Sequence, residues 1–294
     1  MSAIHSNKVS ISSGAEWLLL GFSLLGRAPL QLGLAGGAFG LLSGLALLAV
    51  GENRTGLLLV QVVMTACTAL LLGGLVWAAR EVAQGRSPGA GDLLQGLRAD
   101  KAPKLLALLL PQLLAGTVML LLFLLLVGME PLQVLSDLVT RMEGGYQPKP
   151  EDLQGFPAGR FLLWLLLLVA VALVTAFCTF TAYPQVMFGT DGPLAAMRAS
   201  LQACLRNLGA LLVFFLLLGI TFMAINVAVS LLATVVSLLA GQAGMVLVAQ
   251  TLMMAVLMPV MAGAFHAAWR QLHGDAAATD DGAAVPAPTG QIEV

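Results

Sequence analysis

Long stretches without any charged residue divide this sequence into segments that suit the interior of a membrane. No Asp, Glu, Lys or Arg occurs in residues 28–51, 55–79, 105–129, 161–190 or 207–265. A charged side chain at the centre of a bilayer costs roughly 2.5–3.5 kcal/mol, and one helical crossing needs about 20 residues. Each of the first four stretches therefore suits one crossing, and the fifth is long enough for two.

The fifth stretch contains a break in its helical pattern. Gly241-Gln242-Ala243-Gly244 separates two apolar segments, and glycine disfavours a helix interior. We therefore predict an all-α fold, a polytopic membrane helical bundle with about six transmembrane helices. The fifth span exceeds the length of one crossing, so it is expected to tilt or to project past the headgroups. The predicted spans are 30–50, 57–79, 105–128, 161–183, 208–235 and 245–268.

The overall composition supports this class. Only 10% of the residues are charged, whereas a soluble domain has about 25%. Residues 1–272 are predicted to form a single membrane domain, and residues 273–294 a disordered cytoplasmic tail, because that segment is rich in Ala, Asp, Pro and Gly. The net charge of −1 provides no field that would attract nucleic acid.

The distribution of Lys and Arg predicts the orientation of the spans. If the N-terminus lies inside, ten of the 14 Lys and Arg residues fall on the cytoplasmic side. The other four are Arg54, Arg141, Lys149 and Arg160. Cytoplasmic loops carry an excess of basic residues, so both termini are predicted to be cytoplasmic.

Three short segments precede the three predicted pairs of spans. Residues 16–27, 92–101 and 193–206 each combine an amphipathic stretch with a cation. Ser13 and Glu16 form an S-x-x-E capping box, which predicts the start of the first of these helices. The pattern predicts three repeats of an amphipathic helix followed by a transmembrane hairpin. The general likeness of hydrophobic segments explains the same pattern without a repeat.

The third segment has the clearest amphipathic pattern. Its apolar residues share one helical face: Leu194, Met197, Leu201, Leu205 and Leu208. Arg198, Gln202 and Arg206 follow one another at intervals of four on another face. This is typical of a helix that lies in the interface with its cations toward anionic headgroups. Together with Arg27 and Arg98, these three residues are our candidate contacts to membrane lipids or partner proteins.

A ridge of glycines runs along the first predicted span. Gly36, Gly40 and Gly44 recur every four residues, a spacing that lets two helix backbones approach closely. We interpret the ridge as a helix-packing surface inside the protomer. An oligomer interface or a pore lining would use the same spacing.

The apolar segments contain few groups for chemistry. Four methionines near His266 could bind copper(I), although methionine is also common filler in apolar helices: Met253, Met254, Met258 and Met261. The polar residues within the predicted spans are all neutral: Gln61, Gln112, Gln185, Asn226 and Gln250. Such residues either line a substrate path or form hydrogen bonds between helices. The sequence has no HExxH, GxSxG, CxxC or P-loop motif. We predict no catalytic, cofactor or metal site, and no enzyme activity.

Two short motifs precede the first and the fifth predicted spans. Trp17 and Gly21 are followed by Arg27-Ala28-Pro29, and Ala203-Cys204-Leu205-Arg206-Asn207 comes later. These motifs resemble those of an uncharacterised family of proteobacterial six-span inner-membrane proteins, although this chain lacks basic residues between Trp17 and Arg27. The resemblance implies a bacterial inner membrane and six spans, and it implies no functional residue.

Two functions are compatible with these observations. The first is a non-catalytic scaffold or envelope-maintenance factor, which would act through its cytoplasmic amphipathic helices on lipids or on a protein partner, including a second copy of itself. The alternative is a channel or carrier for a small uncharged or lipophilic solute. The glycine ridge and the pairs Pro111-Gln112 and Pro184-Gln185 suggest this alternative.

Overall fold

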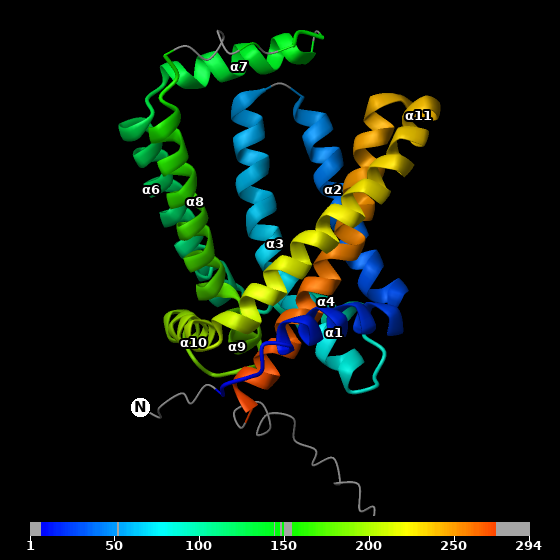
Figure 1. The fold of residues 1–294 in the computed structure, drawn as a ribbon. Coiled ribbons are helices and arrows are strands. Elements are labelled where there is room, and N and C mark those ends of the chain that lie inside the picture. Colours follow the sequence, from blue (N-terminus) through cyan, green and yellow to red (C-terminus); the bar gives the residue numbers. More distant parts are fainter. Residues whose placement is uncertain (1–6, 52, 144, 148, 150–154, 275–294) are drawn as a thin grey trace, which may run out of the picture. The chain divides into compact units, whose positions relative to one another are not determined.

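The computed structural model of the chain describes residues 7–51, 53–143, 145–147, 149 and 155–274. Every regular element within these ranges is a helix, which confirms the predicted all-α class (Figure 1). The chain divides into two compact units. Unit 1 comprises Met1–Leu108 and Thr179–Val294, and unit 2 comprises Leu109–Cys178.

Unit 1 contains most of the helices. It begins with a short helix, two long helices and three short segments: α1 (Ser13–Arg27), α2 (Pro29–Val50), α3 (Arg54–Ala83), α4 (Ala90–Leu93), the 3-10 helix η1 (Leu94–Leu97) and α5 (Ala102–Ala107). After unit 2, the chain returns to unit 1 in three further helices: α9 (Ala182–Phe188), α10 (Pro193–Arg206) and α11 (Leu208–Leu272).

Within the described residues, five helical segments are long and apolar enough to cross a membrane. They are Pro29–Val50, Arg54–Ala83, Ala102–Leu126, Ala158–Phe188 and Leu208–Leu272. Their surfaces are rich in exposed leucine and valine; Leu58 on α3, for example, is 69% exposed. Surfaces of this kind suit contact with lipid, because lipid tails solvate apolar side chains.

The last of these segments, α11, is 65 residues long and is interrupted at one point. Gly241 has φ 68° and ψ −171°, a backbone conformation that is open essentially to glycine alone. Figure 1 shows the ribbon turning back near the label α11. The break falls where the sequence predicts it, and we call residues 208–240 the first arm and residues 242–272 the second arm.

The first arm is longer than one crossing requires. At 1.5 Å per residue it extends about 50 Å, against a hydrocarbon thickness of about 30 Å. Such an excess is accommodated by tilt or by projection beyond the bilayer. The prediction of an oversized fifth span therefore agrees with the helix that the chain forms.

Glycines bring α2 into backbone contact with the second arm. A methyl group at Gly36 would overlap the carbonyl oxygen of Met254, and one at Gly40 would overlap that of Gln250. The ridge extends to Gly44, where a methyl group would lie 3.1 Å from Leu247. Close backbone approach of this kind provides the van der Waals contact that holds helices together in lipid.

Unit 2 contains α6 (Leu110–Leu126), α7 (Glu130–Glu143) and α8 (Ala158–Thr179). Trp164 of α8 joins α8 to α6 in two ways. Its ring packs edge-on against Phe123, with centroids 5.0 Å apart, and its indole N–H donates a hydrogen bond to the carbonyl oxygen of Met119 at 3.0 Å.

Two local features differ from the sequence predictions. Helix α1 begins at Ser13 with Ser12 at its N-cap, and no side chain caps it, so the predicted Ser13–Glu16 capping box is wrong. The segment 92–101 is not one amphipathic helix, because α4 and η1 have only four residues each. The threefold repeat therefore stays a prediction. Most of the predicted tail, residues 275–294, lies outside the described residues.

Replacing Gly40 with alanine is expected to lower the free energy of unfolding by about 1–3 kcal/mol, because the added methyl group overlaps the backbone of the second arm. The matched control is Gly219→Ala on the first arm, where a methyl group meets no atom within 4 Å. The control should be neutral or stabilising by up to about 1 kcal/mol. Unfolding in detergent measures both variants, and equal effects would contradict the close contact.

Candidate functional site

Helix α1 lies across both arms of α11 (Figure 1). Gly14 contacts the first arm, because a methyl group there would overlap the carbonyl oxygen of Ala210. Gly21 contacts the second arm at Val260 in the same way. Gly14 and Gly21 are seven residues apart and therefore share one face of the helix. They allow α1 to pack directly against the backbones of both arms.

Hydrogen bonds fix the register of α1 on the second arm. The indole N–H of Trp17 donates to Gln271 Oε1 at 2.8 Å, and Gln271 Nε2 donates to Glu16 Oε2 at 3.3 Å. Trp17 is completely buried, and its ring packs against Phe180 and Phe214. A buried indole N–H needs an acceptor, so Gln271 is tied to this position.

The two ends of the described chain meet beside this contact. The backbone N–H of Asn7 donates to the carbonyl oxygen of Leu272 at 2.8 Å. The side chain of Asn207 accepts from the N–H of Val9 at 2.9 Å and donates to the carbonyl oxygen of Asn7 at 3.0 Å. His273 is buried here, and burial lowers the pKa of its imidazole.

Helix α9 forms the buried centre of this end of unit 1. Every residue of Ala182–Phe188 is buried. Gln185 Oε1 accepts a hydrogen bond from the indole N–H of Trp269 at 2.7 Å, and Gln185 Nε2 donates to Asp191 Oδ2 at 3.0 Å. Gln185, which the sequence marks as an intramembrane polar residue, therefore links α9 to the second arm.

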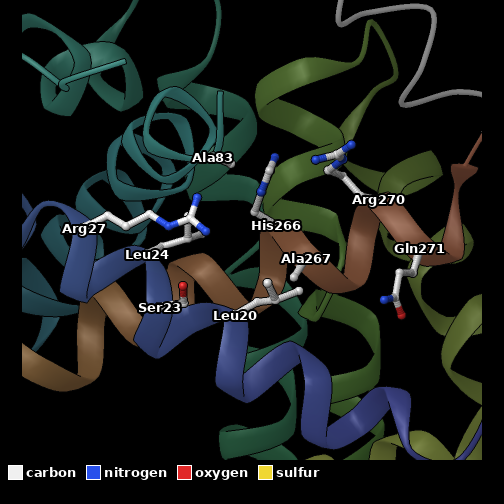
Figure 2. Close-up of a pocket in the computed structure, with 9 residues that line it drawn as sticks. All are labelled: Leu20, Ser23, Leu24, Arg27, Ala83, His266, Ala267, Arg270 and Gln271. Atoms are coloured by element: carbon white, nitrogen blue, oxygen red, sulfur yellow. The ribbon is translucent and has the colours of Figure 1, made fainter. Parts of the chain in front are cut away.

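A cavity of about 340 Å³ lies between α1 and the end of the second arm (Figure 2). Arg27 and Ser23 come from α1, one helical turn apart, and His266 and Arg270 come from α11 at the same spacing. In Figure 2, the guanidinium of Arg27 extends from α1 toward His266. The full lining is Leu20, Ser23, Leu24, Arg27, Ala83, His266, Ala267, Arg270 and Gln271.

The cavity is cationic. Neither Arg27 nor Arg270 forms an ion pair with an acidic side chain among the residues that the structure describes. The acids on the surrounding helices have other partners, since Glu16 accepts from Gln271 and Glu81 pairs with Arg86 at 2.5 Å. His266 is 4% exposed, with its ring 5.9 Å from that of Phe188.

The other candidate contacts lie outside this cavity. Arg198, Gln202 and Arg206 are exposed on α10, as the helical spacing predicts. The predicted single apolar face of α10 is divided, because Met197 is buried against the protein while Leu194 is 66% exposed. Besides Met197, the packed face consists of small residues and contains no leucine: Ala196, Ala199, Ser200, Ala203 and Cys204.

Arg98 and two of the four methionines near His266 make contacts within the protein. Arg98 follows η1, and its guanidinium is 3.3 Å from the carboxylate of Asp100. Met254 contributes its backbone to the contact with Gly36, and Met258 is buried in the second arm. His266 contacts aromatic rings.

A second, smaller cavity of about 180 Å³ lies between α2, α3 and the second arm. Its polar groups are Ser43, Gln61, Thr65, Thr68 and Gln250. Gln250 Nε2 donates to Ser43 Oγ at 3.3 Å, and the two threonine hydroxyls donate to carbonyl oxygens of their own helix. Gln61 and Gln250 therefore line the same polar cavity, which is open at the exposed Gln61. Gln112 and Asn226 are also exposed, and they do not line this cavity.

Comparison with known proteins gives no assignment: the chain matches no protein-family model, no curated protein sequence and no solved structure.

Replacing Gln185 with methionine should destabilise the protein by about 1–3 kcal/mol, because the buried indole N–H of Trp269 loses its acceptor. Trp269→Phe removes the donor, and the double variant should cost less than the sum of the two single variants. Unfolding of all four proteins in detergent measures this difference. Strict additivity would show that the hydrogen bond contributes nothing to stability.

Proposed function

We propose that this chain is a non-catalytic, six-span membrane protein that acts as a scaffold or envelope-maintenance factor. It would hold anionic lipids, or a protein partner on the same surface, through the interfacial helices α1 and α10. The proposed location is a bacterial inner membrane with both termini on the cytoplasmic side. The observation that carries this proposal is the division of the surface of α10.

Helix α10 has three strips along its length. One strip of small residues packs against the protein, a second exposes Leu194 and Leu205, and a third exposes Arg198 and Arg206. The leucine strip lies next to the arginine strip on the helical wheel. A helix in the plane of a membrane interface needs this arrangement, because its leucines enter the hydrocarbon while its arginines reach anionic headgroups.

Helix α1 has a related division. One face packs on α11 through Trp17 and Gly21, and the outer face exposes Leu19 at 67%. The helix ends in the exposed Arg27, which lines the cavity beside α11. Both helices lie at the end of unit 1 opposite the turn of α11 (Figure 1). Two leucine-bearing helices at one end of the spans support a common interfacial plane.

The meeting of the chain ends supports an even number of crossings. Asn7 and Leu272 are joined by a hydrogen bond, so the segments before the first span and after the last lie at the same end. An odd number of crossings would separate them by the thickness of the bilayer. Counting α11 as two crossings, divided at Gly241, gives six.

The cytoplasmic placement is supported by charge. Ten of the 14 Lys and Arg residues fall on the side of α1 and α10, and basic residues mark the cytoplasmic side of bacterial membrane proteins. The resemblance of the Arg27-Ala28-Pro29 and Cys204-Leu205-Arg206-Asn207 motifs to inner-membrane proteins supports the same location.

Replacing both Arg198 and Arg206 with glutamate should reduce the amount of phosphatidylglycerol that copurifies with the protein. Each cation near an anionic surface contributes about 1 kcal/mol, so the loss of affinity should be about tenfold or more. The control is Arg198→Lys with Arg206→Lys, which keeps both charges. Lipid analysis of the purified proteins measures the effect. Unchanged lipid content in a correctly inserted glutamate variant would contradict the proposal.

The second cavity favours one other function, a carrier for a small uncharged solute. Its glutamines, Gln61 and Gln250, lie on two different spans, and polar groups within the membrane often mark a transport path. Flux of a solute into liposomes that disappears in Gln61→Leu and Gln250→Leu would favour this function over a scaffold.

A further inference from the structure

We propose that the cavity between α1 and the end of α11 binds the phosphate group of an anionic phospholipid, with Arg27 and Arg270 as its main ligands. This inference rests on the proposed interfacial position of α1, and it adds a defined binding site for one lipid molecule. It differs from the surface of α10, where exposed cations attract headgroups without a cavity.

The charge of the cavity selects an anion. Two guanidinium groups and the hydroxyl of Ser23 line it together with His266, and none of its nine lining residues is acidic. Guanidinium groups bind phosphate through two parallel hydrogen bonds, which makes arginine well suited to this ligand. An anion between Arg27 and Arg270 also offsets the repulsion between two like charges.

The size and the rigidity of the cavity suit a headgroup. A volume of about 340 Å³ is at the lower end of the range for small-molecule sites. Its α1 wall is fixed by the Trp17–Gln271 hydrogen bond and by the close approach of Gly21 to the second arm. A wall that is already fixed loses little conformational entropy when the ligand binds.

The position of the cavity at the ends of the proposed spans favours a lipid over a free phosphate ion as the ligand. Arg27 ends α1 two residues before α2 begins at Pro29, and Arg270 lies in the last turn of α11. Both guanidiniums therefore belong to the headgroup region at the ends of spans. Leu20 lines the cavity and is 42% exposed, and Leu30 on the first turn of α2 is 69% exposed. Leu20 provides an apolar surface for an acyl chain at the cationic site, and Leu30 follows Arg27 by three residues along the chain.

Thermal unfolding of the purified full-length chain in a neutral detergent tests the proposal. The probes are short-chain phosphatidylglycerol, short-chain phosphatidylcholine and inorganic phosphate. Of these three probes, we expect only phosphatidylglycerol to raise the melting temperature of the protein. Arg27→Gln with Arg270→Gln should weaken its binding by about tenfold or more, because charge-assisted hydrogen bonds are lost. Arg54→Gln with Arg160→Gln is the matched control, because it makes the same change in charge at exposed residues outside α1, α10 and the cavity, and it should retain the shift. Arg198→Gln with Arg206→Gln is measured beside it and reports on binding at α10.

Three other outcomes overturn the proposal. An equal shift with inorganic phosphate, lost in the Arg27/Arg270 variant, would make the ligand a soluble anion. Equal losses in the Arg27/Arg270 and Arg54/Arg160 variants would indicate a general effect of surface charge. Loss in the Arg198/Arg206 variant alone would reject the cavity and leave the proposed function of α10 intact. Loss in the Arg27/Arg270 variant with the shift retained in the Arg54/Arg160 control supports the cavity, whatever the role of α10.

Native mass spectrometry of the unmodified protein provides an independent test, which does not depend on the folding of a variant. One phosphatidylglycerol should remain bound at a collision energy that removes phosphatidylcholine. Equal release of the two lipids from the unmodified protein would overturn the proposal.

Discussion

Two tryptophan–glutamine hydrogen bonds hold together segments that are far apart in the sequence. Trp17 donates to Gln271, and Trp269 donates to Gln185, so α1, α9 and the end of α11 share one fixed arrangement. In lipid, apolar side chains gain little by leaving the solvent, and hydrogen bonds and close backbone contact determine packing instead. The position of the cationic cavity depends on this arrangement, because all but one of its lining residues belong to α1 and α11.

The same arrangement connects topology with the proposed function. Backbone contact at Gly14 and Gly21 places α1 across both arms of α11, and the hydrogen bond from Asn7 to Leu272 brings the chain ends together. In the interfacial position that we propose, α1 could not turn its leucines away from the membrane without breaking these buried contacts. A rigid interfacial surface is what a scaffold or a lipid-binding factor needs, since binding then costs little ordering.

Charge-free gaps and helical spacing predict the apolar helices, the break at Gly241 and the bounds of α10 well, because the cost of a charge in lipid is large and local. The packing of α10 was predicted less well. Met197 and Leu194 are both apolar, and only tertiary structure shows that one is buried and the other exposed. Of the cationic cavity, the sequence singled out Arg27. Its partner Arg270 lies more than 240 positions away, and no local pattern indicates that the two share a site.

Accessibility of single cysteines tests the central claim most directly, namely that both chain ends and the interfacial helices share one side of the membrane. In a variant in which the native cysteines are replaced, a cysteine at Lys8, Gln202 or Gln242 is treated with a membrane-impermeant maleimide in intact spheroplasts and in inverted vesicles. The account predicts that Lys8 and Gln202 react only in inverted vesicles, and that Gln242 at the turn of α11 reacts only in spheroplasts. Reaction of Lys8 and Gln202 from opposite sides would contradict it.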